Sequence, residues 1–187
     1  MSGFWIFVIA LVALGGFAVI IYNRIVALNE RADQAYADVD VQLKQRHDLV
    51  PNLVETVKGY ASHERETLEQ VVSARNAAVS ATGAAEQGRA EGMLEAALGK
   101  LFALAEAYPD LKANQNFLEL QRELSDVENK IAAARRFFNS AVQEYNTIIQ
   151  QIPGNFIAPM GGYKQREFFE IPEVARAAPP PEVSFSS

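Results

Sequence analysis

An uninterrupted apolar segment near the N-terminus constrains this chain more than any other feature. Residues 4–22 read FWIFVIALVALGGFAVIIY and contain no charged or strongly polar side chain. As a helix rising about 1.5 Å per residue, the segment would span roughly 28 Å, which matches the hydrocarbon core of a bilayer. Trp5 and Tyr22 bracket the segment where amphipathic rings favour the interface, and Arg24 follows at headgroup level. The segment therefore predicts a transmembrane anchor over residues 1–23, in contact with the lipid bilayer through residues 4–22.

A cleaved signal peptide is the competing interpretation of this segment. Signal peptides have a charged N-terminal region, a shorter apolar core and small residues before the cut, so an uncleaved anchor is favoured. Before the segment the only positive group is the terminal amine, whereas Arg24, Arg31, Lys44 and Arg46 follow it. The positive-inside rule then predicts that the C-terminal domain faces the cytoplasm.

Composition limits the rest of the chain. A length of 187 residues is enough for an anchor and one further domain. The net charge of -6 argues against a nucleic-acid partner, because phosphate binding relies on clustered Lys and Arg. The chain has no cysteine, which excludes disulfides and thiolate metal sites.

Helical periodicity continues beyond the anchor. No Gly or Pro follows Tyr22 closely, and apolar residues recur at helical spacing, so the anchor is expected to run on as one helix. Because Pro51 disfavours a helix interior, we expect this helix to end near His47 and a second to start with Asp48 as its N-cap; a kinked continuous helix is the alternative. The Gly-rich residues 80–92 predict a loop before a third helix with Met93 and Leu94 on its apolar face.

The fourth predicted helix has the clearest pattern. Apolar residues alternate three and four apart from Phe117 to Ile152, a sustained heptad seam of the coiled-coil type, and Pro153-Gly154 ends it. No segment has a strand pattern. We therefore predict an all-α chain in which the transmembrane helix continues into an antiparallel four-helix bundle over residues 24–153.

Residues 154–187 are predicted to form an irregular to disordered tail. The last dozen residues, with three prolines at 179–181, favour disorder. Four aromatic residues precede them, and we expect these to pack on one end of the bundle, with docking on membrane or partner as the alternative; they are Phe156, Tyr163, Phe168 and Phe169.

No catalytic, cofactor-binding or metal-binding residues are predicted. His47 and His63 are the only histidines, and neither has the companions of a di-iron or zinc-protease site, so both are expected at the surface or capping turns. Asn139 and Asn146 lie beside the apolar seam, where amides can fix register by bonding across helices. Arg135-Arg136 is expected to be a surface charge pair.

Two segments resemble the LemA family of bacterial membrane proteins. The sequence YNRIVALNERADQAYADVDVQLKQRHDLVPNLVETVKGYASHE at residues 22–64 is similar to the most characteristic stretch of that family. ARRFFNSAVQEYNTIIQQIPGNFIA at residues 134–158 is similar to its second block. The resemblance implies an N-terminal anchor and a four-helix bundle at the bacterial inner membrane. It implies no reaction, cofactor or catalytic residue.

The leading functional hypothesis is a non-enzymatic, membrane-anchored scaffold or interaction protein, with a protein partner or self-association as its mode of action. One alternative is a ligand-sensing bundle that binds a small molecule between helices. The other is a protein that organises or remodels membrane through self-association. An enzyme is not expected, because no nucleophile, base and orienting group can be assembled from the sequence.

Because the chain lacks cysteine, its topology can be measured with one substitution, Ser187→Cys. We expect a membrane-impermeant maleimide to label this thiol only after the cell membrane is permeabilised, since the basic residues after the anchor favour the cytoplasm. Labelling of intact cells whose outer envelope has been made permeable would contradict the orientation and place the C-terminal domain outside.

Overall fold

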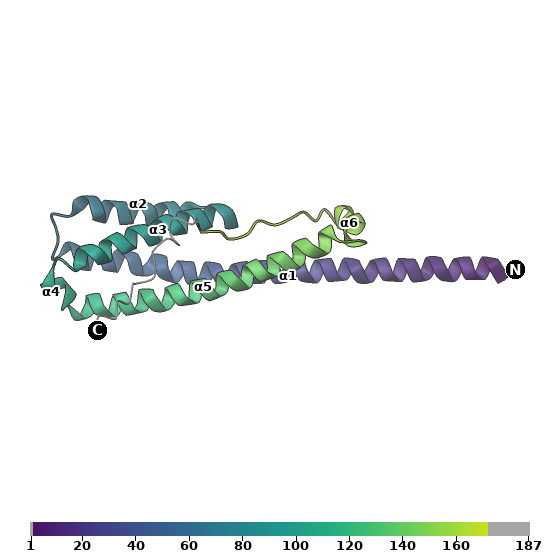
Figure 1. The fold of residues 1–187 in the computed structure, drawn as a ribbon, viewed down its shortest axis with the longest axis horizontal. Coiled ribbons are helices and arrows are strands. Elements are labelled where there is room, and N and C mark those ends of the chain that lie inside the picture. The colour runs from purple at the N-terminus through teal and green to yellow at the C-terminus, as the bar shows by residue number, and fades with distance from the viewer. Residues whose placement is uncertain (1, 172–187) are drawn as a thin grey trace, which may run out of the picture. The chain divides into compact units, whose positions relative to one another are not determined.

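The computed structural model describes residues 2–171, and these form helices without any strand among them. This confirms the predicted all-α class. The elements are labelled in Figure 1, and their order along the chain is α1 (Ser2–Lys58), α2 (Arg65–Ser80), α3 (Ala84–Ala105), α4 (Pro109–Lys112), α5 (Gln115–Gln150), α6 (Gly154–Ile157) and the 3-10 helix η1 (Ala158–Gly161). The predicted disorder of the last dozen residues lies outside the described part of the chain.

The chain divides into two compact units, and two helices contribute to both. Unit 1 contains the chain up to Val41 together with Ile131–Phe168, and unit 2 contains Gln42–Lys130 with the segment that starts at Phe169. The boundaries therefore fall within α1 and within α5. Each unit has its own core and is described separately.

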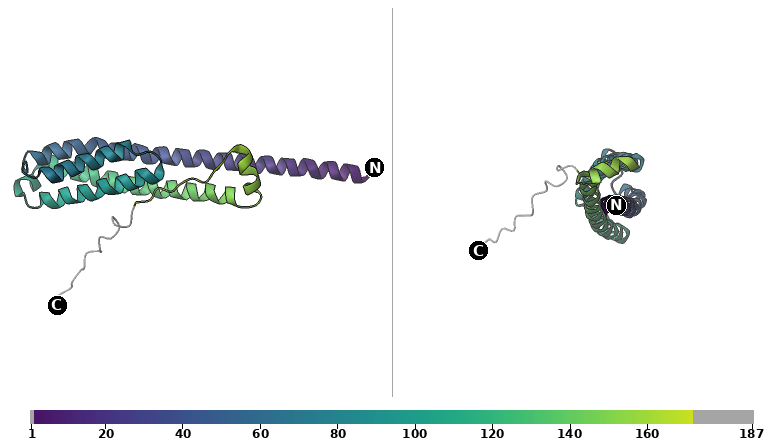
Figure 2. Two further views of the ribbon diagram at one scale, coloured as in Figure 1. Left: turned by 90° about the horizontal axis from the view of Figure 1, so that it is seen from above. Right: turned by 90° about the vertical axis from the view of Figure 1, so that its right-hand side faces the viewer.

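Unit 2 is built from four helical segments that share one apolar core: the end of α1, all of α2 and α3, and the beginning of α5 (Figures 1 and 2). Its fully buried members include Leu53 from α1, Val71 from α2, and Leu94 and Leu101 from α3. Phe117 of α5 packs into the same core, with its ring 6.2 Å from that of Phe102. An antiparallel four-helix bundle spanning residues 24–153 stays a prediction.

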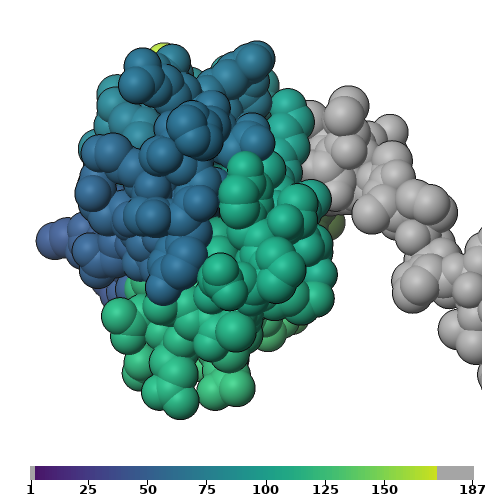
Figure 3. Space-filling view, turned by 90° about the vertical axis from the view of Figure 1, so that its left-hand side faces the viewer, coloured from purple at the N-terminus to yellow at the C-terminus, as the bar shows by residue number. Residues whose placement is uncertain are grey.

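At one end of unit 2, the connection between α1 and α2 contacts the residues that flank α4. Figure 3 shows this end, where the blue surface of the connection lies beside the green surface of α4 and the start of α5. The Tyr60 hydroxyl accepts a hydrogen bond from Nδ2 of Asn114 at 2.9 Å, and the Tyr108 hydroxyl donates to Glu64 at 3.1 Å. Asn114 also caps α5, because its Oδ1 accepts the Phe117 N–H at 3.0 Å.

The Gly-rich stretch does not form the predicted long loop. Helix α3 begins at Ala84, directly after Gly83, whose φ of 78° is a left-handed conformation that glycine adopts without strain. Gly88 lies within α3 where the backbone of Glu170 passes, and a Cβ there would collide with the Glu170 carbonyl oxygen. These two glycines serve a tight turn and a close chain approach. The prediction of a loop over residues 80–92 was wrong, and Met93 is also 57% exposed.

Helix α5 confirms the prediction for the last long helix. It covers 36 residues and ends at Gln150, shortly before Pro153. In unit 1 its final part packs on α1, where Tyr145 and Ile149 share a core with Ile25. Arg31 of α1 pairs with Glu144 of α5 at 2.9 Å.

Helix α1 passes through Pro51, which corrects the prediction that a helix ends near His47 with Asp48 as the next N-cap. Proline lacks the N–H that would bond the carbonyl four residues earlier, here that of His47. Arg75 of α2 supplies the missing donor, since its Nε bonds the His47 carbonyl oxygen at 2.8 Å. The alternative of a continuous helix was right because a side chain from another helix satisfies the orphan carbonyl.

This arrangement predicts an energetic coupling between Pro51 and Arg75. Arg75→Ala should lower the unfolding free energy by about 1–3 kcal/mol, because the His47 carbonyl loses a charged donor. In a Pro51→Ala background the restored backbone N–H takes that carbonyl, so the same substitution should cost about 1 kcal/mol less. The measurement is a double-mutant cycle by urea unfolding of the full chain in detergent micelles. Additive effects of the two substitutions would contradict the coupling.

Candidate functional site

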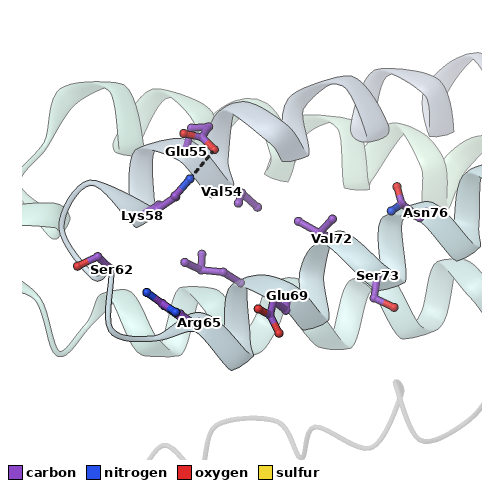
Figure 4. A pocket seen from close by; sticks show the side chains of 10 residues that line it. Val54, Glu55, Lys58, Ser62, Arg65, Glu69, Val72, Ser73 and Asn76 are labelled. Atoms are coloured by element: carbon purple, nitrogen blue, oxygen red, sulfur yellow. Dashed lines mark hydrogen bonds and ion pairs between the residues drawn. The ribbon is translucent and has the colours of Figure 1, made fainter.

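A groove with a volume of about 750 Å³ lies between the end of α1 and α2. Figure 4 shows that Val54 from α1 and Val72 from α2 point into the space between these helices. Leu68 completes the apolar floor. Val54 and Leu68 are buried by the core, whereas Val72 is 42% exposed. The groove therefore offers an apolar surface that is continuous with the core of unit 2.

Charged residues of both signs border the groove. Glu55 and Lys58 lie on the α1 side, where they form an exposed ion pair at 3.4 Å (Figure 4). Arg65 and Glu69 lie on the α2 side. Exposed pairs of this kind contribute little to stability, so these side chains are available to meet charges on a partner. An apolar floor with a charged rim combines the two features found in grooves that bind amphipathic helices.

A buried polar cluster lies at the centre of unit 2. Arg46 of α1 is 1% exposed and pairs with Glu91 of α3, which is fully buried. The other guanidinium nitrogen of Arg46 bonds Glu128 of α5 at 2.6 Å. His47 Nε2 lies 2.6 Å from the second Glu91 oxygen. One carboxylate thus joins two adjacent side chains of α1 to α3, and Arg46 extends the network to α5.

The environment of Glu91 favours its charged form. Burial raises its pKa, and this is the largest single influence, but hydrogen bonds and charges from His47 and Arg46 together outweigh it, so the pKa lies below the usual range. Because Glu91 is 0% exposed, a substrate has no access to its carboxylate. The Glu91 carboxylate therefore acts on the packing of the helices.

The position of Arg46 could have been recognised from spacing. Buried residues of α1 follow one another three or four apart at Val39, Leu43, Arg46 and Val50, so Arg46 occupies a core position of the helix. Glu91 similarly lies three residues before the buried Leu94 of α3. Ionisable residues at such positions signal a buried network, since they are rarely buried without partners.

The predicted polar residues have different fates. His63 is exposed as predicted, but the prediction of a surface or capping role for His47 was wrong, because it is only 8% exposed and contacts Glu91. Asn146 does not bond across helices. Its amide instead exchanges two hydrogen bonds of 2.9 Å with the backbone of Arg166, in the extended segment after η1.

The remaining predicted residues lie in unit 1 or at its edge. Arg136 is exposed, while Arg135 and Asn139 are half-buried. Of the four aromatic residues expected to pack, Phe169 is buried and Tyr163 and Phe168 are half-buried, but Phe156 is 69% exposed. Packing of Phe156 was therefore predicted wrongly. Within residues 2–171, no group of three or more His, Cys, Asp or Glu is arranged to hold a metal ion.

Among the described residues, the N-terminal part of α1 is the only helical segment with the length and composition needed to cross a bilayer. Apart from the half-buried Val8, its large apolar side chains are 51% to 70% exposed over residues 4–20. Fold and surface together define an all-helical protein with one membrane-length apolar helix.

Comparison with known proteins supports this class. A model of the LemA family matches residues 35–185, and the chain belongs to the LemA family. It is 27% identical to magnetosome protein MamQ of Magnetospirillum gryphiswaldense, over 87% of this chain and 69% of that protein. It is 26% identical to magnetosome protein MamQ 2 of Paramagnetospirillum magneticum, over 80% and 64%. Protein LemA of Metamycoplasma hominis is 25% identical, over 82% and 71%. The chain thus spans about two thirds of the length of these relatives.

Glu91→Gln should destabilise the protein and change its response to acid. The substitution removes the buried charge that Arg46 and His47 share and leaves Glu128 as the carboxylate paired with Arg46, which we expect to cost about 3 kcal/mol. Because the folded pKa of Glu91 is lowered, its contribution is present above the unfolded pKa and is lost as pH falls through the folded pKa. As the pH falls from the unfolded pKa of Glu91 to its folded pKa, the unfolding free energy of the wild type, measured with urea, should therefore decrease more steeply than that of Glu91→Gln. The exposed Glu119→Gln on α5 is the control, and equal acid profiles for wild type and Glu91→Gln would contradict this account.

Proposed function

We propose that this protein is a membrane-anchored, non-enzymatic interaction protein that uses the groove between α1 and α2 to bind an amphipathic helix of a protein partner. The observation that carries the proposal is the groove itself, with its apolar floor at Val54, Leu68 and Val72 and its mixed-charge rim. The scaffold role and the identity of the partner are part of the proposal.

The exposed apolar side chains of α1 support the membrane anchor. A helix that is apolar on all sides must be buried in protein or in lipid. Exposed apolar side chains lie on different sides of the helix, and each of the following is at least 51% exposed: Phe4, Phe7, Val12 and Phe17. Residues 4–22 are long enough to cross the hydrocarbon core, so lipid is the environment that satisfies them. We place this anchor in the bacterial inner membrane with the C-terminal domain in the cytoplasm.

The chemistry of the groove supports a protein partner. Helix recognition in a groove depends on apolar anchors that recur every three to four residues and fill a floor between two helices. Each wall carries one charge of either sign, Glu55 and Lys58 on α1 and Arg65 and Glu69 on α2. Such a rim selects partner orientation more than it adds affinity. The names of the relatives, protein LemA and magnetosome protein MamQ, describe no enzymatic reaction, which fits this class.

A photo-crosslinking amino acid at Val72 tests the proposal in intact cells. We expect one discrete adduct from this position, because Val72 is the exposed part of the groove floor. The same amino acid at Glu119, which is exposed on α5 and does not line the groove, serves as the matched control.

A second variant separates specific binding from chance contact. With the crosslinker at Ser73, the substitution Val72→Asp should abolish the adduct, because a charge on the floor opposes apolar docking. Val72→Ile should preserve it. Equal adducts from Val72 and Glu119, or enzymatic turnover by the purified protein, would overturn the proposed function.

A further inference from the structure

Unit 1 exposes large apolar side chains after the end of α5. Ile152 is 79% exposed, Phe156 69% and Met160 86%. They lie in the segment formed by residues 151–163, which contains α6 and η1 and which we name the cap. Apolar side chains that gather at the surface mark a site that meets lipid or another molecule.

The cap is held against α1 where the apolar segment ends. The ring of Tyr163 packs edge-on against that of Tyr22, with centroids 6.0 Å apart. Ala158 is buried in the small core that contains Ile25 and Tyr145. Figures 1 and 2 both show α6 beside α1. Since Tyr22 is the last residue of the apolar segment, the cap lies at the level of α1 where a bilayer containing this segment would end.

The charges of this region suit an anionic lipid surface. Residues 1–29 and 145–166 contain no Asp or Glu, although the chain as a whole carries a net charge of -6. Their basic residues are Arg24, Lys164 and Arg166. Arg166 is paired with Asp33 at 2.7 Å, whereas Arg24 and Lys164 are exposed. Exposed basic residues near a membrane are attracted by anionic headgroups.

We propose that the cap is a second membrane contact, which inserts Ile152, Phe156 and Met160 into the boundary between headgroups and acyl chains. This inference rests on the proposed anchor in α1. A bilayer surrounds its anchor on every side, so the side of α1 that carries the cap also faces lipid. Exposed apolar side chains beside basic ones are the pattern of segments that lie in the interface. A protein partner or second copy on the cap is a different outcome, which spin labelling distinguishes.

Site-directed spin labelling of the full-length chain tests this contact, because the chain has no native cysteine. Single-label variants Met160→Cys and Ile152→Cys report on the cap. Val12→Cys, 70% exposed within the apolar segment, reports on the anchor. Ala37→Cys, exposed on α1 about 22 Å beyond Tyr22, is the control for solvent. Each protein is placed in nanodiscs of phosphatidylethanolamine and phosphatidylglycerol, with one chain per disc and, in a second sample, with two, and label collisions with oxygen and with a water-soluble nickel complex are compared.

We expect both cap labels to collide preferentially with oxygen, at a depth between those of the Val12 and Ala37 labels. A cap in water would give the Ala37 result while Val12 stays deep, and this would overturn the inference but leave the anchor intact. Labels shielded from both reagents would mean that protein covers the cap, which also overturns it. A Val12 label accessible to nickel would overturn the anchor and the cap contact together.

Discussion

Backbone hydrogen bonding is the constraint on which the structure of α1 depends. Residues 6–21 have no polar side chain that could satisfy a backbone N–H or C=O, so the segment must satisfy these groups internally, and in lipid only a helix or a closed barrel can do so. Once a helix is nucleated, adding residues is inexpensive. No glycine or proline interrupts the residues that follow until Pro51. The helix passes even this residue because Arg75 bonds the carbonyl that proline leaves without a donor.

At the polar centre of unit 2, side chains from other helices satisfy the buried charges, although Nε of Arg46 has no hydrogen-bond partner. Burying Arg46 and Glu91 costs desolvation energy, which their mutual attraction and their bonds to His47 and Glu128 offset. Apolar residues at these positions could give equal stability. A carboxylate that must meet two side chains of α1 accepts only one register between α1 and α3, however, whereas an apolar seam tolerates several. We therefore assign the cluster a role in specifying the pairing of α1 with α3.

Sequence patterns predicted the features that depend on many residues at once. The apolar segment is continuous over residues 4–22, and the seam of the last long helix repeats one spacing from Phe117 to Ile152, so no single exception obscures either pattern. Prediction failed where one residue depends on a distant one. Pro51 reads as a helix boundary until Arg75 is placed beside it, and Gly88 reads as a loop residue until Glu170 is found against it. His47 has no partner nearby in sequence, since Glu91 lies on another helix.

Of the two candidate surfaces, the groove was not visible in the sequence, because it combines residues of α1 and α2. For the cap, a continuous segment, the sequence offered docking on membrane or partner only as the alternative to packing. Their chemistry nevertheless separates them. The groove carries charges of both signs, which suits a polypeptide, whereas the cap and the anchor lie in segments that contain basic but no acidic residues. These segments carry +3, so the remaining residues together carry -9 against the total of -6. An anionic bilayer attracts the first set and repels the second within about a Debye length. Electrostatics therefore favours the proposed contact with lipid at the cap.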